Sequence, residues 1–128
     1  MRNVMRAVVG LVGMFNLVLG LGFLFDPAQA GLRFFITSLG TQGMATMRAD
    51  FTAFFVTGAA FALVGAWRAW RTPLLVPLLL LSIAIAGRVV SLIADGAPPM
   101  AFPPMIAEAV MILLLALGWR SFDAEKRA

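Results

Sequence analysis

The chain has 128 residues, of which 62% are hydrophobic and only 12% are charged. Soluble domains average about 45–50% apolar and about 25% charged residues, so this composition is typical of a membrane protein. The absence of cysteine and histidine excludes disulfides, thiolate catalysis and the commonest metal ligand and general base. We therefore expect a single domain over residues 1–128 with no cofactor and no metal site.

The net charge of +4 does not by itself indicate a nucleic-acid partner. Proteins that bind nucleic acid gather their basic residues on one soluble face, whereas here these residues are scattered between apolar runs. This placement fits membrane topology better, and we expect membrane lipids and no nucleic acid as partners.

Four long apolar segments predict an all-α transmembrane four-helix bundle. They cover residues 7–25, 47–67, 74–94 and 104–119. A helix rises about 1.5 Å per residue and needs roughly 20 apolar residues to cross a bilayer. Pro77 falls in the first turn of the third segment, where a missing N–H matters least.

The first segment also admits a second interpretation, as a signal peptide. Arg2 and Arg6 precede it, and Ala28-Gln29-Ala30 resembles a small-residue cleavage site. The apolar stretch exceeds the usual length of about 7–15 residues, and Asp26-Pro27 interrupts the chain before the site. We expect the segment to be retained as a membrane helix.

The connection between the first two helices contains several turn signals. Asp26-Pro27 predicts a helix stop, or an N-cap followed by proline at the first position of a short helix. Residues 31–39 are too short to cross, so we expect them to lie at the membrane interface or to pack over the end of the bundle. Residues 40–43, Gly-Thr-Gln-Gly, predict a loop.

The distribution of basic residues predicts that both termini lie in the cytoplasm. The predicted cytoplasmic segments hold seven of them: Arg2, Arg6, Arg68, Arg71, Arg120, Lys126 and Arg127. The other side holds Arg33, Arg48 and Arg88, so the positive-inside rule favours this orientation. All three tryptophans also fall at the cytoplasmic interface, where an indole is favoured.

Small residues recur at helical spacing in the first two membrane helices. Examples are Gly10, Gly13 and Gly20 in the first, and Gly58 with Ala62 in the second. Such residues let helix backbones approach closely in lipid. We expect packing within the chain, and the alternative is the seam of a homodimer.

Arg88 is the most unusual residue, because a guanidinium at a bilayer centre costs roughly 2.5–3.5 kcal/mol on insertion scales. Arg88 lies roughly 21 Å along the third helix from Leu74, in the outer half of the bilayer. Glu108 lies some 6 Å along the fourth helix from Pro104, at much the same height. We therefore predict an ion pair, which can be bidentate, between Arg88 and Glu108.

Other polar residues are expected in the same outer half. Ser91 and Asp95 share a helical face with Arg88, and two more mark the outer start of the second helix. The predicted polar cluster consists of Arg48, Asp50, Arg88, Ser91, Asp95 and Glu108. It is either a structural lock that fixes helix pairing or a pocket, open to the outer side, that holds a ligand headgroup or carboxylate. Acid–base catalysis by a carboxylate is a third interpretation, but no motif identifies a substrate and we assign no catalytic residue.

The residues Arg48-Ala49, Gly58, Gly87-Arg88-x-x-Ser91-x-x-x-Asp95-Gly96-x-Pro98 and Glu108 resemble a family of small bacterial four-helix integral membrane proteins of unknown function. The likeness covers most of the chain and implies an inner-membrane location without an established activity. The glycine pair that follows the family's second-helix arginine is missing here. There is a looser likeness, in architecture only, to DoxX-type and sterol-isomerase-type membrane proteins.

These observations favour a non-enzymatic inner-membrane protein. We expect it to bind a lipid-like or amphipathic ligand, or a partner helix, at the outer polar pocket, and a homo-oligomer is possible. One alternative is an accessory or assembly subunit of a membrane complex with purely structural charges. The other is a small membrane enzyme that uses a carboxylate on a lipophilic substrate.

Overall fold

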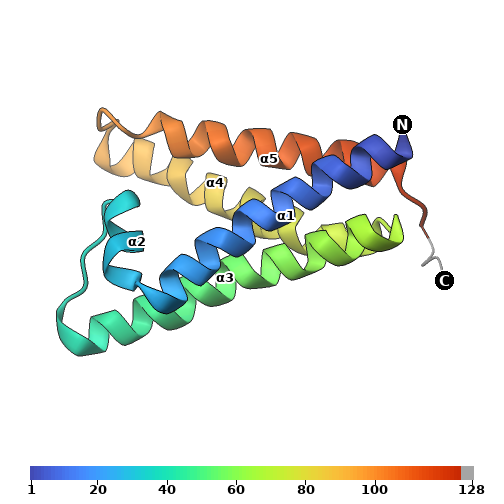
Figure 1. Cartoon of the computed structure of the whole chain (residues 1–128). Helices are drawn as coiled ribbons and strands as arrows, with labels where there is room; N and C mark the ends of the chain where they lie inside the picture. Colours follow the sequence, from blue (N-terminus) through green and yellow to red (C-terminus); the bar gives the residue numbers. More distant parts are fainter. Residues whose placement is uncertain (125–128) are drawn as a thin grey trace.

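The computed structural model describes residues 1–124 as a bundle of helices (Figure 1). The elements in chain order are α1 (Arg2–Phe25), α2 (Pro27–Arg33), α3 (Gly40–Arg68), the 3-10 turn η1 (Thr72–Leu74), α4 (Leu75–Asp95) and α5 (Phe102–Ser121). Within this part of the chain, four helices are long and apolar enough to cross a membrane. The predicted helical bundle is confirmed, and its composition suggests a multi-pass membrane protein.

The connection between α1 and α3 is partly as predicted. Asp26 both ends α1 and caps α2, because its Oδ1 accepts a hydrogen bond of 3.4 Å from Gln29 N while Pro27 occupies the first position. The predicted loop at residues 40–43 is wrong, since α3 begins at Gly40 and not near Met47. Phe35 and Gly40 adopt positive φ angles of 60° and 69° in this connection, and the residues after Gly40 continue as helix.

Close packing of α1 on α3 forms the main contact surface of the bundle. A Cβ added at Gly13 would lie 2.8 Å from Leu63 Cγ, and one added at Gly20 would lie 2.7 Å from Val56 Cγ2. The glycines of α1 therefore let α3 approach closely, as small residues do in lipid. The predicted packing of small residues within the chain is confirmed at these positions.

Hydrogen bonds join the helices at the end where α1 begins and α5 ends, called here the terminal end (Figure 1). Asp123 N donates to Ala69 O, and Arg71 N donates to Asp123 O, each at 3.0 Å. Arg6 also donates from Nε to Ala66 O at 2.9 Å, near the end of α3, where carbonyl groups lack intrahelical partners. These contacts join the start of α1 and the segment after α5 to the end of α3.

The two helix pairs, α1 with α3 and α4 with α5, diverge toward the opposite end, and α2 lies between them there (Figure 1). Stacked aromatic rings support this α2 end. Phe23 of α1 has its ring centroid 4.9 Å from that of Phe51 and 5.8 Å from that of Phe55, both in α3. Phe34, which follows α2, lies 5.5 Å from Phe23 by the same measure. The aromatic cluster thus fixes α2 on α1 and α3.

The α1–α3 contact gives a first prediction, tested by the substitution Gly20→Ala. The new methyl group would overlap Val56 Cγ2 and lie 3.1 Å from the backbone nitrogen of Val56, which cannot move as freely as a side chain. We expect the free energy of unfolding in mixed micelles to fall by about 1–3 kcal/mol. Gly87→Ala is the control, because no atom lies within 4 Å of its added Cβ. Equal stability of both variants would contradict the α1–α3 packing.

Candidate ligand-binding site

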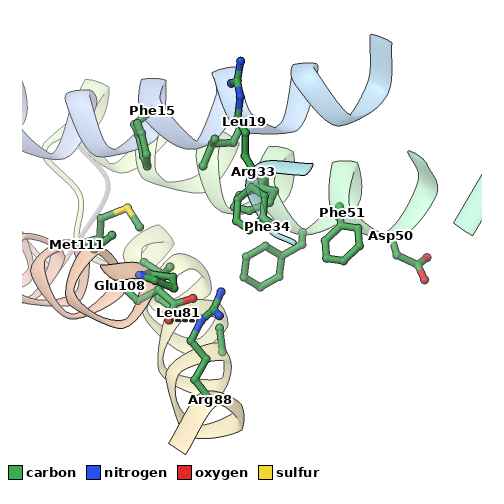
Figure 2. A pocket seen from close by; sticks show the side chains of 15 residues that line it. Phe15, Leu19, Arg33, Phe34, Asp50, Phe51, Leu81, Arg88, Glu108 and Met111 are labelled. Carbon is green, nitrogen blue, oxygen red and sulfur yellow. Dashed lines mark hydrogen bonds and ion pairs between the residues drawn. The ribbon is translucent and has the colours of Figure 1, made fainter. Parts of the chain in front are cut away.

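A cavity of about 460 Å³ lies at the α2 end, between the two diverging helix pairs. All four long helices and α2 contribute to its lining, as Figure 2 shows. Its wall consists largely of aromatic and aliphatic side chains, with five phenylalanines: Phe15, Phe34, Phe51, Phe54 and Phe55. The remaining lining residues are Leu19, Arg33, Asp50, Leu81, Ala84, Arg88, Pro104, Ala107, Glu108 and Met111. The site is therefore an apolar cavity with a few charged groups.

The predicted ion pair of Arg88 and Glu108 is present in the cavity wall (Figure 2). Arg88 Nε donates to Glu108 Oε1 at 2.8 Å, which joins α4 to α5. Glu108 exposes only 9% of its surface, so its carboxylate depends on this guanidinium for charge compensation. The arginine side chain is more open, at 36%.

The predicted pair forms through a single hydrogen bond, although a guanidinium and a carboxylate can also pair in a bidentate way. Arg88 approaches from α4 with its Nε edge toward the carboxylate, and Nε makes the only hydrogen bond between the two side chains. The terminal amino groups of Arg88 donate no hydrogen bond to any residue of the described part of the chain. Since a guanidinium carries five N–H donors, several of them are available to a ligand.

A second cavity, of about 740 Å³, adjoins the first at the α2 end. It is lined by Ser91 and by residues of the proline-rich connection between α4 and α5. Four residues line both cavities and are called here the neck: Arg33, Phe34, Arg88 and Pro104. Arg88 therefore lies where the two cavities meet.

Ser91 lines the second cavity together with Arg88, but within the described residues Arg48, Asp50 and Asp95 form no hydrogen bond or ion pair with the Arg88 guanidinium. Arg48 is exposed and donates from Nε to Leu24 O at 3.1 Å, which ties α3 to the end of α1. Asp50 lines the first cavity, but its carboxylate points away from it (Figure 2). Asp95 is exposed at the end of α4. The cause is the divergence of the helix pairs, which separates the outer start of α3 from the outer end of α4.

The aromatic wall was not predicted as part of the site. Phe51, Phe54 and Phe55 are spaced i, i+3 and i+4, so the sequence places them on one helical face. This spacing could have indicated an aromatic surface. The contribution of α2 had no comparable signal, because its placement depends on how the chain folds back over α1 and α3.

Asn16 serves the helix packing next to the cavity. It is buried in α1, and its Nδ2 donates to Val12 O at 2.9 Å. The same amide nitrogen also lies 3.4 Å from the sulfur of Met111, a residue of α5 that lines the cavity. Both protons of this amide are therefore engaged inside the bundle.

The charged groups of the cavity favour binding over catalysis. Glu108 is its one buried carboxylate among the described residues, and this group is already engaged by Arg88. A general base needs a carboxylate that is free to take a proton from the substrate. No group of three or more His, Cys, Asp or Glu residues that could hold a metal ion occurs within residues 1–124.

Comparisons with protein-family models, with curated proteins and with solved structures found no match for this chain. The resemblance to a family of small four-helix membrane proteins therefore stays a prediction. The function of this chain is therefore inferred from the geometry of the cavity alone.

The ion pair gives a second prediction, from a double-mutant cycle of Arg88→Leu and Glu108→Leu. Arg88→Leu leaves a buried carboxylate uncompensated, so we expect the free energy of unfolding to fall most in this variant. The double variant should recover much of the loss, because two apolar side chains can replace a buried pair at little cost. The expected coupling energy is on the order of 1–3 kcal/mol. Additive losses in the double variant would show that the contact contributes nothing.

Proposed function

We propose that this protein binds a lipid-like amphipathic ligand in the cavity at the α2 end. The observation that supports the proposal is an apolar cavity between the helix pairs. An arginine in the cavity wall retains unused hydrogen-bond donors. Small-molecule sites have the same character, because a mostly apolar lining binds the body of the ligand while a few polar groups orient it.

The size of the cavity supports a ligand of this kind. Pockets for drug-sized ligands measure roughly 300–1,000 Å³, and the cavity of about 460 Å³ falls within this range. The adjoining second cavity gives room for an elongated molecule that passes the neck. An apolar chain would pack against the phenylalanines of the first cavity, and the polar end would reach Arg88.

A purely structural role for the charges, as in an accessory or assembly subunit, is the second candidate. The contact that favours it is the ion pair itself, which joins α4 to α5 regardless of any ligand. This role does not require an apolar cavity beside the pair, whereas the binding function does. A small membrane enzyme is less well supported, because the pairing of Glu108 limits its use as an acid or base.

We further propose that the protein lies in a bacterial inner membrane with its terminal end in the cytoplasm. The terminal end includes Arg2, Arg6 and Arg71, in agreement with the positive-inside rule. Because the chain has no cysteine, single cysteines can report the topology. A membrane-impermeant thiol reagent outside the cell should label Ala97→Cys but not Asn3→Cys. The reverse pattern would contradict the orientation.

A variant that blocks the cavity tests the binding function. Ala84 of α4 lines the cavity, so an indole introduced by Ala84→Trp would fill much of the space. We expect crosslinking to a neutral fatty alcohol that carries a photoactivatable diazirine to fall at least about tenfold, since an excluded ligand loses its apolar contacts.

Ala86→Trp is the matched control, because Ala86 lies on the same helix, is exposed and does not line the cavity. Its crosslinking should equal that of the wild-type protein. Equal labelling of both tryptophan variants and the wild type would mean that the probe binds elsewhere on the bundle, and the proposed site would be wrong.

A further inference from the structure

We infer that the ligand carries a single negative charge and that the terminal amino groups of Arg88 bind it at the neck. The inference rests on the proposed binding function and adds the chemical class of the ligand, a single-chain amphiphile with a carboxylate or similar monoanionic headgroup. It is drawn from the donors of Arg88, from the charge around the neck and from the position of Arg88 between the cavities.

The hydrogen-bond donors of Arg88 form two sets: Nε, which faces Glu108, and the terminal amino groups. Nε is occupied by Glu108 Oε1 at 2.8 Å, while the terminal amino groups have no partner among the described residues. These amino groups present parallel N–H donors in a planar fork that matches the two oxygens of a carboxylate. Figure 2 shows the guanidinium at the edge of the cavity beside the Glu108 carboxylate. The free edge of the fork is thus available to an oxyanion.

The charges around the neck favour an anion with one charge. The Arg88–Glu108 pair is neutral overall, and Arg33, which also lines the neck, adds one positive charge from an exposed side chain. Asp50 does not belong to the neck, because it lines only the first cavity and its exposed carboxylate points away from that cavity. A monoanion matches the single net positive charge, whereas a dianion would place an unpaired negative charge beside an apolar wall.

The position of the neck explains why the anion should also carry an apolar chain. Arg88 and Phe34 line both cavities, and the first cavity continues from them along the aromatic wall. A headgroup bound at Arg88 therefore directs the attached chain toward the phenylalanines. Glu108 is then a positioning residue, because it fixes the guanidinium through Nε and does not itself touch the ligand.

This arrangement predicts opposite effects for the two members of the ion pair. Arg88→Gln removes the donors for the anion and should abolish any preference for a charged headgroup. Glu108→Gln retains an oxygen that can accept from Nε but removes the competing negative charge. It should therefore strengthen anion binding relative to the wild type. A purely structural lock predicts no change in headgroup preference for either variant.

The experiment measures competition against the neutral diazirine probe in a non-ionic detergent at pH 9. The competitors share one chain length and carry a carboxylate, a phosphate monoester or a hydroxyl group. We expect the carboxylate to compete at least about tenfold better than the alcohol, as a charge-assisted hydrogen bond implies. This ratio should fall to about one in Arg88→Gln and rise severalfold in Glu108→Gln.

Arg33→Gln is the control for general positive charge. The guanidinium of Arg33 points away from Arg88 in Figure 2, so it adds positive charge without contacting the headgroup, and its loss should lower the ratio much less than Arg88→Gln does. An equal loss of preference in Arg33→Gln would overturn the assignment to Arg88. Tighter binding of the doubly charged phosphate than of the carboxylate would overturn the single charge.

The outcomes separate this inference from the proposed function. If the carboxylate and the alcohol compete equally in the wild type while Ala84→Trp blocks the probe, the cavity binds a ligand but the inference of an anionic headgroup is wrong. If the probe does not bind in the cavity at all, the proposed binding function and the inferred headgroup are both wrong. If Arg88→Gln does not fold, the rise expected in Glu108→Gln still decides, because an unchanged ratio there contradicts the inference.

Discussion

The ion pair of Arg88 and Glu108 joins α4 to α5 at a level where these two helices have moved away from α1 and α3. The cost of burying the Glu108 carboxylate determines which groups must surround it. The buried carboxylate needs a cation, and the cation that it receives retains donors that face a cavity. A lock made of two apolar residues would join the same helices without creating a polar group beside an apolar wall.

The two ends of the bundle differ in how they are held together. At the terminal end, hydrogen bonds between backbone groups of Ala69, Arg71 and Asp123 link the helix ends directly. At the α2 end, stacked phenylalanines and α2 lie between the helix pairs, and a cavity remains beside them. The molecule therefore combines a terminal end closed by hydrogen bonds with an α2 end that contains a cavity.

The length of the apolar runs and the depth of each polar residue along its helix predicted the four long helices and the ion pair. The four long helices follow from the length of the apolar runs, and the pairing of Arg88 with Glu108 follows from the constant rise of antiparallel helices. Both predictions depend on distances along one or two helix axes, which the sequence determines. The capping of α2 by Asp26 is equally local.

Other features depend on angles between helices and could not be predicted in this way. Arg48 binds Leu24 O instead of joining Arg88, and Asp50 shares a cavity with Arg88 but points away from it, because matching depth does not imply matching position around a bundle whose pairs diverge. The single hydrogen bond between Arg88 and Glu108, in place of a bidentate contact, reflects the side on which α4 meets α5. The predicted loop at residues 40–43 was wrong because the chain has turned by Gly40, through the positive φ angles of Phe35 and Gly40, and the next residues are helical.

Native mass spectrometry of the protein released from membranes in a mild non-ionic detergent shows whether the cavity holds a ligand. We expect a wild-type population that carries one bound single-chain amphiphile, identified as a monoanion after release, and a bare chain for Ala84→Trp. A bare wild-type chain would rule out the bound ligand, and adducts that the two proteins retain equally would rule out the cavity as its site.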